Sequence, residues 1–234
     1  MNLFSSIRLN QVHVIPAAMM IRIWLLTAIE LGLTPVAAWL AITFGGIDAE
    51  SHTGLFVLNV ALIILIGLWV FFQRDSFSTF LASLLGVFLV ALVGTALSAF
   101  CSVTAIATVF GIVGAMFAFN AMLSLLLGWN PGSRWLILLM VASGIIFTVM
   151  VNSLLGSGLS VWVMSILAVL VWAAAAFYKL DALSELPRKL YVEEFSTLPR
   201  CMALGGLMIY LSALELFFQV LMFLIEIVAG MLGW

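Results

Sequence analysis

Long runs of apolar residues alternate with short polar segments along the chain, and each run is long enough to cross a membrane. A transmembrane helix needs about 20 apolar residues, whereas a membrane β-barrel needs alternating apolar and polar positions, which this chain lacks. The pattern predicts an all-α polytopic membrane bundle of seven transmembrane helices, with residues 1–234 forming a single domain. The expected spans are 23–44, 54–72, 77–98, 104–127, 135–155, 159–178 and 203–225.

Composition agrees with this pattern and narrows the possible functions. Hydrophobic residues make up 66% of the chain and charged residues 8%, against about a quarter charged in soluble domains, so the lipid bilayer is the first expected partner. A net charge of −2 without a basic run argues against nucleic acid as a binding partner. The chain has no P-loop, and both histidines, His13 and His52, lie outside the expected spans. We therefore expect neither an enzyme nor a bound cofactor, and the sequence indicates no particular metal.

The basic residues determine the expected orientation. All eight fall on the same side of the seven spans: Arg8, Arg22, Arg74, Arg134, Lys179, Arg188, Lys189 and Arg200. By the positive-inside rule the N-terminus is cytoplasmic and the C-terminus is external. Cys101 and Cys201 then lie at opposite membrane surfaces, so we expect no disulfide between them.

The last span has one polar face. At 100° per residue, four polar positions fall within about 60° of one another on a helix, namely Ser212, Glu215, Gln219 and Glu226. A charge in the centre of a bilayer costs about 2.5–3.5 kcal/mol, so this face should point at other helices or at water between them. We therefore expect the last helix to be central and the others to surround it.

The first span also contains a carboxyl near mid-depth, Glu30, on a stripe with Thr27 and Thr34. No Lys or Arg is expected at the depth of Glu30 or Glu215. Each carboxyl is then a neutral group hydrogen-bonded to its neighbours, or part of a proton- or cation-responsive site.

Two further features allow alternative interpretations. Asn120 and Asn152 lie within spans, where an amide serves either as a hydrogen bond between helices or as a ligand, and the hydrogen bond is the commoner role. The connection 179–200 contains four basic and four acidic residues together with Pro187 and Pro199. It is expected to be either a solvated loop or a charged cap over the cytoplasmic end of the last helix.

Several segments resemble the Bax inhibitor motif family of membrane proteins. Residues 109–158 read VFGIVGAMFAFNAMLSLLLGWNPGSRWLILLMVASGIIFTVMVNSLLGSG, which is similar to the fourth and fifth spans of that family. Residues 176–186, AFYKLDALSEL, stand where the family has a Tyr-Asp motif. Residues 209–217, IYLSALELF, stand where it has Leu-Tyr-Leu-Asp and an Asn three residues later.

The resemblance implies six helices around the seventh, in the cell (inner) membrane, with an aspartate pair near the cytoplasmic end that gates a pH-sensitive calcium leak. The gate candidates that it implies are Lys179, Asp181 and Tyr210. Lys179 replaces the first aspartate and Ser212 the second, so the pair is not intact. The bacterial YccA-like branch is similar in having Ser at the second position, and it is associated with a membrane-bound AAA protease.

Two hypotheses follow. The first is a proton-regulated pathway for calcium or another cation along the last helix, which involves Glu30 and the four polar residues of the last span. The second is a non-conducting regulator that binds a membrane-bound protease in membrane protein quality control. Glu215 is the residue expected to sense protons under the first hypothesis.

Overall fold

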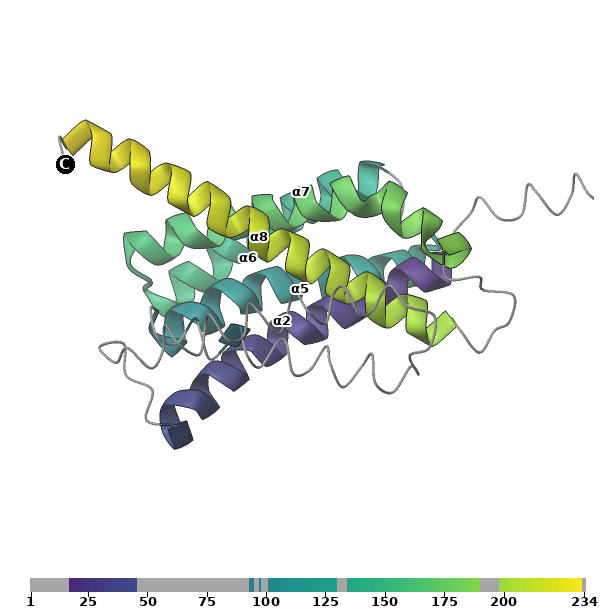
Figure 1. Cartoon of the computed structure of the whole chain (residues 1–234), viewed down its shortest axis with the longest axis horizontal. Coiled ribbons are helices and arrows are strands. Elements are labelled where there is room, and N and C mark those ends of the chain that lie inside the picture. The colour runs from purple at the N-terminus through teal and green to yellow at the C-terminus, as the bar shows by residue number, and fades with distance from the viewer. Residues whose placement is uncertain are drawn as a thin grey trace, which may run out of the picture.

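The computed structural model describes five long helices, α2 and α5 to α8, and no strand within the described residues (Figure 1). Those residues are 17–45, 93–94, 97, 101–129, 134–189 and 198–232. The helix bounds are Ala17–Gly45 for α2, Val103–Leu127 for α5, Arg134–Leu155 for α6, Leu159–Lys189 for α7 and Leu198–Leu232 for α8.

Each of these five helices is long and apolar enough to cross a membrane. The candidate spans are Met19–Leu40, Val103–Leu127, Trp135–Leu155, Leu159–Leu180 and Met202–Val220. Five of the seven predicted spans thus coincide with a helix. The predicted span 54–72 lies outside the described residues, and of 77–98 only three residues are described, all of them helical.

Local sequence explains where α5 begins and ends and where α6 ends. The Ser102 side chain accepts a hydrogen bond from the Ala105 amide at 3.3 Å and caps α5, which ends at Gly128 in the left-handed conformation. Gly156, also at positive φ, ends α6, and there the Ser157 amide donates to the Asn152 carbonyl at 3.0 Å.

The ends of α7 and α8 differ from the prediction. The expected connection 179–200 is largely helical, because α7 continues to Lys189 and α8 begins at Leu198. Residues 180–186 include Ala, Leu and Glu, which have high helix propensity, so the helix persists past the apolar run. Pro199 falls in the first turn of α8, where its missing N–H breaks no helical hydrogen bond.

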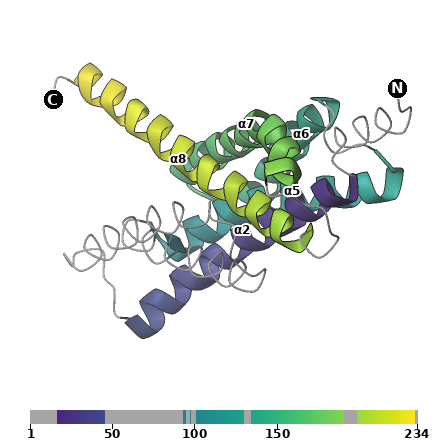
Figure 2. The same ribbon diagram turned by 45° about the vertical axis from the view of Figure 1, so that its right-hand side comes forward.

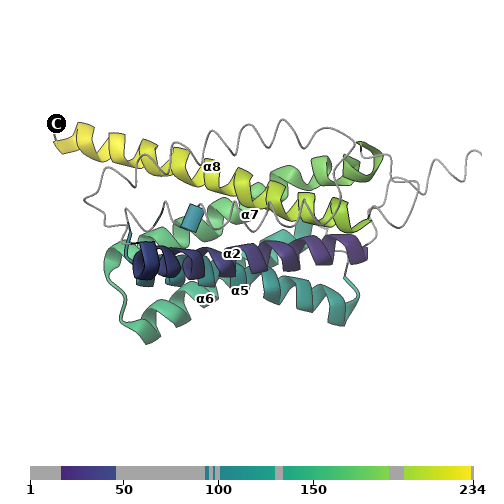
Figure 3. The same cartoon turned by 60° about the horizontal axis from the view of Figure 1, so that its bottom comes forward.

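Among the described helices α5 has the central position, since it packs against α2, α6 and α7. Figure 3 shows α8 along one side of this bundle, with α5 and α6 toward the opposite side. The main contacts of α8 are with α2 and α7. The described residues therefore place α5, and not the expected last helix, in the middle of these five.

Aromatic and small side chains hold the helices together. Trp172 of α7 packs edge-on against Phe110 of α5, with ring centroids 5.6 Å apart, and lies 5.7 Å from the Phe217 ring of α8. Gly144 of α6 has no room for a side chain, since an added Cβ would lie 2.6 Å from Val169 Cγ1 and 2.8 Å from Met116 Sδ. Close packing of this kind is typical of helices inside a membrane.

Large apolar side chains cover the outside of the described helices. Leu126, Leu154 and Leu159 are at least three-quarters exposed, as is Trp135 at the start of α6. Soluble proteins rarely expose apolar surface to this extent, whereas lipid-facing helices do so along their length. This surface identifies an integral, multi-pass membrane protein.

Candidate functional site at the contact of α2 and α8

Glu30 lies in the middle of the α2 span. It is 11 residues from Met19 and 10 from Leu40, or about 15 Å from each end at 1.5 Å per residue. Its side chain is partly buried, and its Oε2 is fully buried without a hydrogen-bond partner in the part of the chain that the structure describes. A carboxyl at this depth without such a partner is costly, so it is the first candidate for a functional group.

The Glu30 carboxyl rests against the backbone of α8. A Cβ added to Gly206 would lie 3.5 Å and 3.6 Å from the two carboxyl oxygens and 3.2 Å from Leu26 Cβ. The adjacent Gly205 is packed against Ile23 and Leu183. The two glycines therefore bring α8 close to α2 at the depth of the carboxyl, as small residues do in membrane helix contacts.

One turn further along α2, a pair of hydroxyls joins the two helices. Thr34 Oγ1 lies 2.7 Å from the hydroxyl oxygen of Tyr210, and both side chains are fully buried. Thr34 Oγ1 also donates to the Glu30 carbonyl at 3.0 Å. These contacts define what we call the Glu30 site: Glu30, Thr34, Gly206 and Tyr210.

The predicted polar face of the last helix points elsewhere. Glu215 and Gln219 are exposed, with Gln219 Nε2 donating to Glu215 Oε1 at 3.4 Å, and Ser212 is partly buried. At 100° per residue Glu215 lies about 180° around the helix from Gly206, on the side away from the Glu30 site. The side chain of Glu226 lies outside the described part. The structure thus separates Glu30 from Glu215 and Gln219, the two exposed members of the expected pathway.

The implied cytoplasmic gate residues do not form one group in the described part. Lys179 lies at the end of the α7 span, with Nζ 5.2 Å from the ring centroid of the exposed Tyr178, a cation–π contact. Tyr210 lies eight residues, or about 12 Å, inside the α8 span. The side chain of Asp181 lies outside the described part. Tyr210 therefore belongs to the Glu30 site.

The two membrane asparagines have different roles. Asn120 Nδ2 of α5 donates to Ser143 Oγ of α6 at 2.9 Å and to the Met116 carbonyl at 2.8 Å. The expected hydrogen bond between helices is confirmed for this residue. Asn152 Nδ2 donates within α6, to the Thr148 carbonyl at 3.0 Å.

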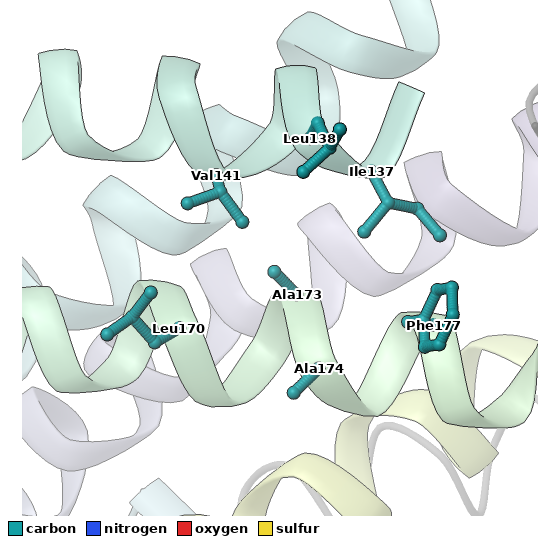
Figure 4. Close-up of a pocket in the computed structure, with 7 residues that line it drawn as sticks. All are labelled: Ile137, Leu138, Val141, Leu170, Ala173, Ala174 and Phe177. Atoms are coloured by element: carbon teal, nitrogen blue, oxygen red, sulfur yellow. The ribbon is translucent and has the colours of Figure 1, made fainter. Parts of the chain in front are cut away.

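A groove of about 390 Å³ lies between α6 and α7 (Figure 4). All seven side chains that line it are apolar: Ile137, Leu138, Val141, Leu170, Ala173, Ala174 and Phe177. Such a lining suits hydrocarbon and provides no ligand for an ion. The groove is therefore distinct from the Glu30 site.

Periodicity in the sequence identified Glu30 and its threonine stripe but missed Gly206. Gly206 precedes Tyr210 by four residues, so both lie on the same helix face. A small residue four positions before a tyrosine was the feature of the sequence that could have indicated the face of α8 that contacts α2.

The fold and its exposed surface define a multi-pass helical membrane protein, and comparison with known proteins adds a relationship. The chain is 30% identical to a protein of Escherichia coli (strain K12) described as "Uncharacterized protein YbhM". The match extends over 192 residues, which are 80% of this chain and 79% of that protein. The chain therefore belongs to the same family as YbhM. No family model and no solved structure matches it.

Proposed function

We propose that this protein is a proton-regulated cation pathway of the Bax inhibitor type, in the cell (inner) membrane with its N-terminus in the cytoplasm. The observation that supports the proposal best is Glu30, a carboxyl at mid-span whose Oε2 is buried without a described partner. An ionisable side chain inside a membrane helix is expensive, and such groups commonly mark proton or ion pathways.

The structure leads us to assign proton sensing to Glu30 in place of Glu215. Glu30 lies between two helices, where a change of its charge alters their contact, whereas Glu215 is exposed. Calcium is the permeant ion that the family resemblance implies. Glu30 regulates that flow in this proposal and need not bind the ion.

Ion flux into liposomes that contain the purified protein tests the proposal. Calcium and potassium entry would be measured as a function of pH for the parent protein, for Glu30→Gln and for the matched control Glu215→Gln. We expect a pH-dependent flux in the parent that loses its pH dependence in Glu30→Gln and keeps it in Glu215→Gln. Liposomes that stay sealed to both ions at every pH would refute a cation pathway.

The exposed pair on α8 supports a second candidate function. Glu215 and Gln219 lie on the outward face of a membrane span, where polar groups gain from hydrogen bonds to another helix. A YccA-like regulator that binds a membrane-bound AAA protease would use such a face. In that case Glu215→Leu should reduce co-purification with the protease and alter degradation of its membrane substrates, while Glu30→Gln should change neither.

A further inference from the structure

The direction of the hydrogen bonds in the Glu30 site follows from counting protons. The Thr34 hydroxyl has a single proton, and Oγ1 donates it to the Glu30 carbonyl at 3.0 Å. At 2.7 Å from the same Oγ1, the hydroxyl of Tyr210 must then be the donor. The Tyr210 hydroxyl therefore donates to Thr34 Oγ1, and the Thr34 hydroxyl donates to the backbone carbonyl of Glu30.

An ionised Glu30 would compete for the proton of the Tyr210 hydroxyl. Glu30 and Thr34 are four residues apart on one face of α2, and the carboxyl of Glu30 lies against Gly206, one turn before Tyr210 on the facing side of α8. Hydrogen bonds to a carboxylate are roughly twice as strong as those between neutral groups. We infer that Tyr210 is a two-position switch between α2 and α8: its hydroxyl donates to Thr34 when Glu30 is neutral and to the Glu30 carboxylate when Glu30 is ionised.

The other charged and titratable groups around the site are few in the described part. On α8 they are Tyr210 itself and Glu215, which lies on the opposite face. On α7, which meets α8 where Leu183 lies against Gly205, Tyr178 is exposed and Lys179 Nζ lies against the Tyr178 ring. The α5 helix has no titratable side chain, and neither do residues 93, 94 and 97, of which Gly94 lies against the Thr34 carbonyl. On α2, Arg22 is exposed, two turns before Glu30. The hydroxyls are therefore the described groups that can compensate a charge on Glu30.

The same groups indicate which species the site binds. One carboxyl and two hydroxyls provide fewer oxygen ligands than the six to eight that Ca²⁺ takes. A proton needs only the carboxyl, so the described side chains of this site suit a proton better than Ca²⁺.

The switch changes the contact between the helices. When Tyr210 leaves Thr34 for the Glu30 carboxylate, the hydrogen bond from α8 to α2 moves along α2 by one turn, toward the glycine contact. Pro35 follows Thr34 directly and cannot donate to the Leu31 carbonyl, so α2 already lacks one helical hydrogen bond there. Ionisation of Glu30 is thus expected to shift the contact of α8 along α2, and this inference rests on the proposed function only for its effect on ion flow.

Infrared difference spectra of the protein in lipid, recorded during a pH titration, test the switch directly. The C=O stretch of a protonated carboxyl that is absent in Glu30→Gln reports the protonation of Glu30. In Tyr210→Phe the carboxylate loses its donor, so the midpoint should move to higher pH. In Thr34→Val the tyrosine proton is free for the carboxylate, so the midpoint should move to lower pH. Each shift should be about 0.4–1.1 pH units, the value of one neutral hydrogen bond: Thr34→Val removes that bond from the neutral state, and Tyr210→Phe removes the difference between it and a charge-assisted bond about twice as strong.

The opposite signs separate a switch from a structural role. Thr34→Ser keeps the hydroxyl and should keep the parental midpoint, which also covers the case that Thr34→Val does not fold. Shifts of Tyr210→Phe and Thr34→Val in the same direction, or no shift in either, would overturn the switch, as would the absence of a titrating Glu30 band. A titrating band with opposite shifts in liposomes that stay sealed would support the switch and refute the cation pathway.

Discussion

Gly144→Ala tests the packing of α5, α6 and α7 with a single methyl group. The added Cβ would lie 2.6 Å from Val169 Cγ1, so α6 and α7 must separate by about 1 Å to reach an ordinary contact. Val169 is β-branched and cannot turn away, while Met116, 2.8 Å away at Sδ, is flexible enough to do so. Overpacking of this kind costs about 1–3 kcal/mol.

The control is Gly111→Ala on α5, where an added Cβ meets nothing within 4 Å. Both substitutions gain about 0.8–1.0 kcal/mol of helix propensity, so the gain cancels between them. Gly144→Ala should therefore be less stable than Gly111→Ala by about 1–3 kcal/mol.

Free energies of unfolding from denaturant titration in mixed micelles provide the measurement. Val169→Ala made together with Gly144→Ala should recover part of the loss, because the clashing methyl groups are gone, and the two substitutions should be non-additive. Equal stabilities for Gly144→Ala and Gly111→Ala would show that α6 and α7 do not meet at this glycine.

Four further predictions concern the site and the topology. Gly206→Ala puts a methyl against the Glu30 carboxyl and excludes water from its charged form, so the midpoint of the Glu30 infrared titration should rise, whereas Gly32→Ala, with nothing within 4 Å, should leave it unchanged. Burial raises the pKa of the Cys101 thiol, so at pH 8 this residue should react more slowly than free cysteine with an impermeant maleimide added outside, and the difference should shrink as pH rises. Lys179→Asp restores the aspartate that the family resemblance implies and should increase a pH-dependent leak in the liposome assay; unchanged flux would argue against Lys179 as a latch. Reporter fusions after Arg74, Arg134 and Lys189 should be cytoplasmic, whereas fusions at Asp48 and after Trp234 should be external. A cytoplasmic C-terminus would refute the model of seven spans.

The helices were largely predictable because a membrane span is a local property of the sequence. The expected span 104–127 differs from α5 by one residue, since Ser102 and Gly128 are recognisable end signals. The end of α7 was missed because hydropathy marks where a helix leaves the membrane, and α7 continues beyond that point to Lys189.

The Glu30 site was predictable only in part, because its contacts join distant segments. Periodicity placed Glu30 and Thr34 on one stripe, but the bond from Thr34 to Tyr210 spans 176 positions and depends on how α2 meets α8. Periodicity also grouped Glu215 with Gln219 correctly, and Gln219 Nε2 does donate to Glu215 Oε1. It could not tell which way that face points, because a polar stripe can face neighbouring helices or a partner beyond the bundle.

Because α8 is long, a small rotation at the Glu30 site produces a large displacement at the C-terminal end of the helix. The helix runs without a break for 35 residues, about 52 Å, and its C-terminal part stands clear of the other described helices (Figure 2). From Gly206 to Leu232 is about 39 Å, so a rotation of about 5° at the glycine contact displaces the far end by about 3 Å. A change in the charge of Glu30 can therefore move the C-terminal part of α8 at the opposite surface of the membrane.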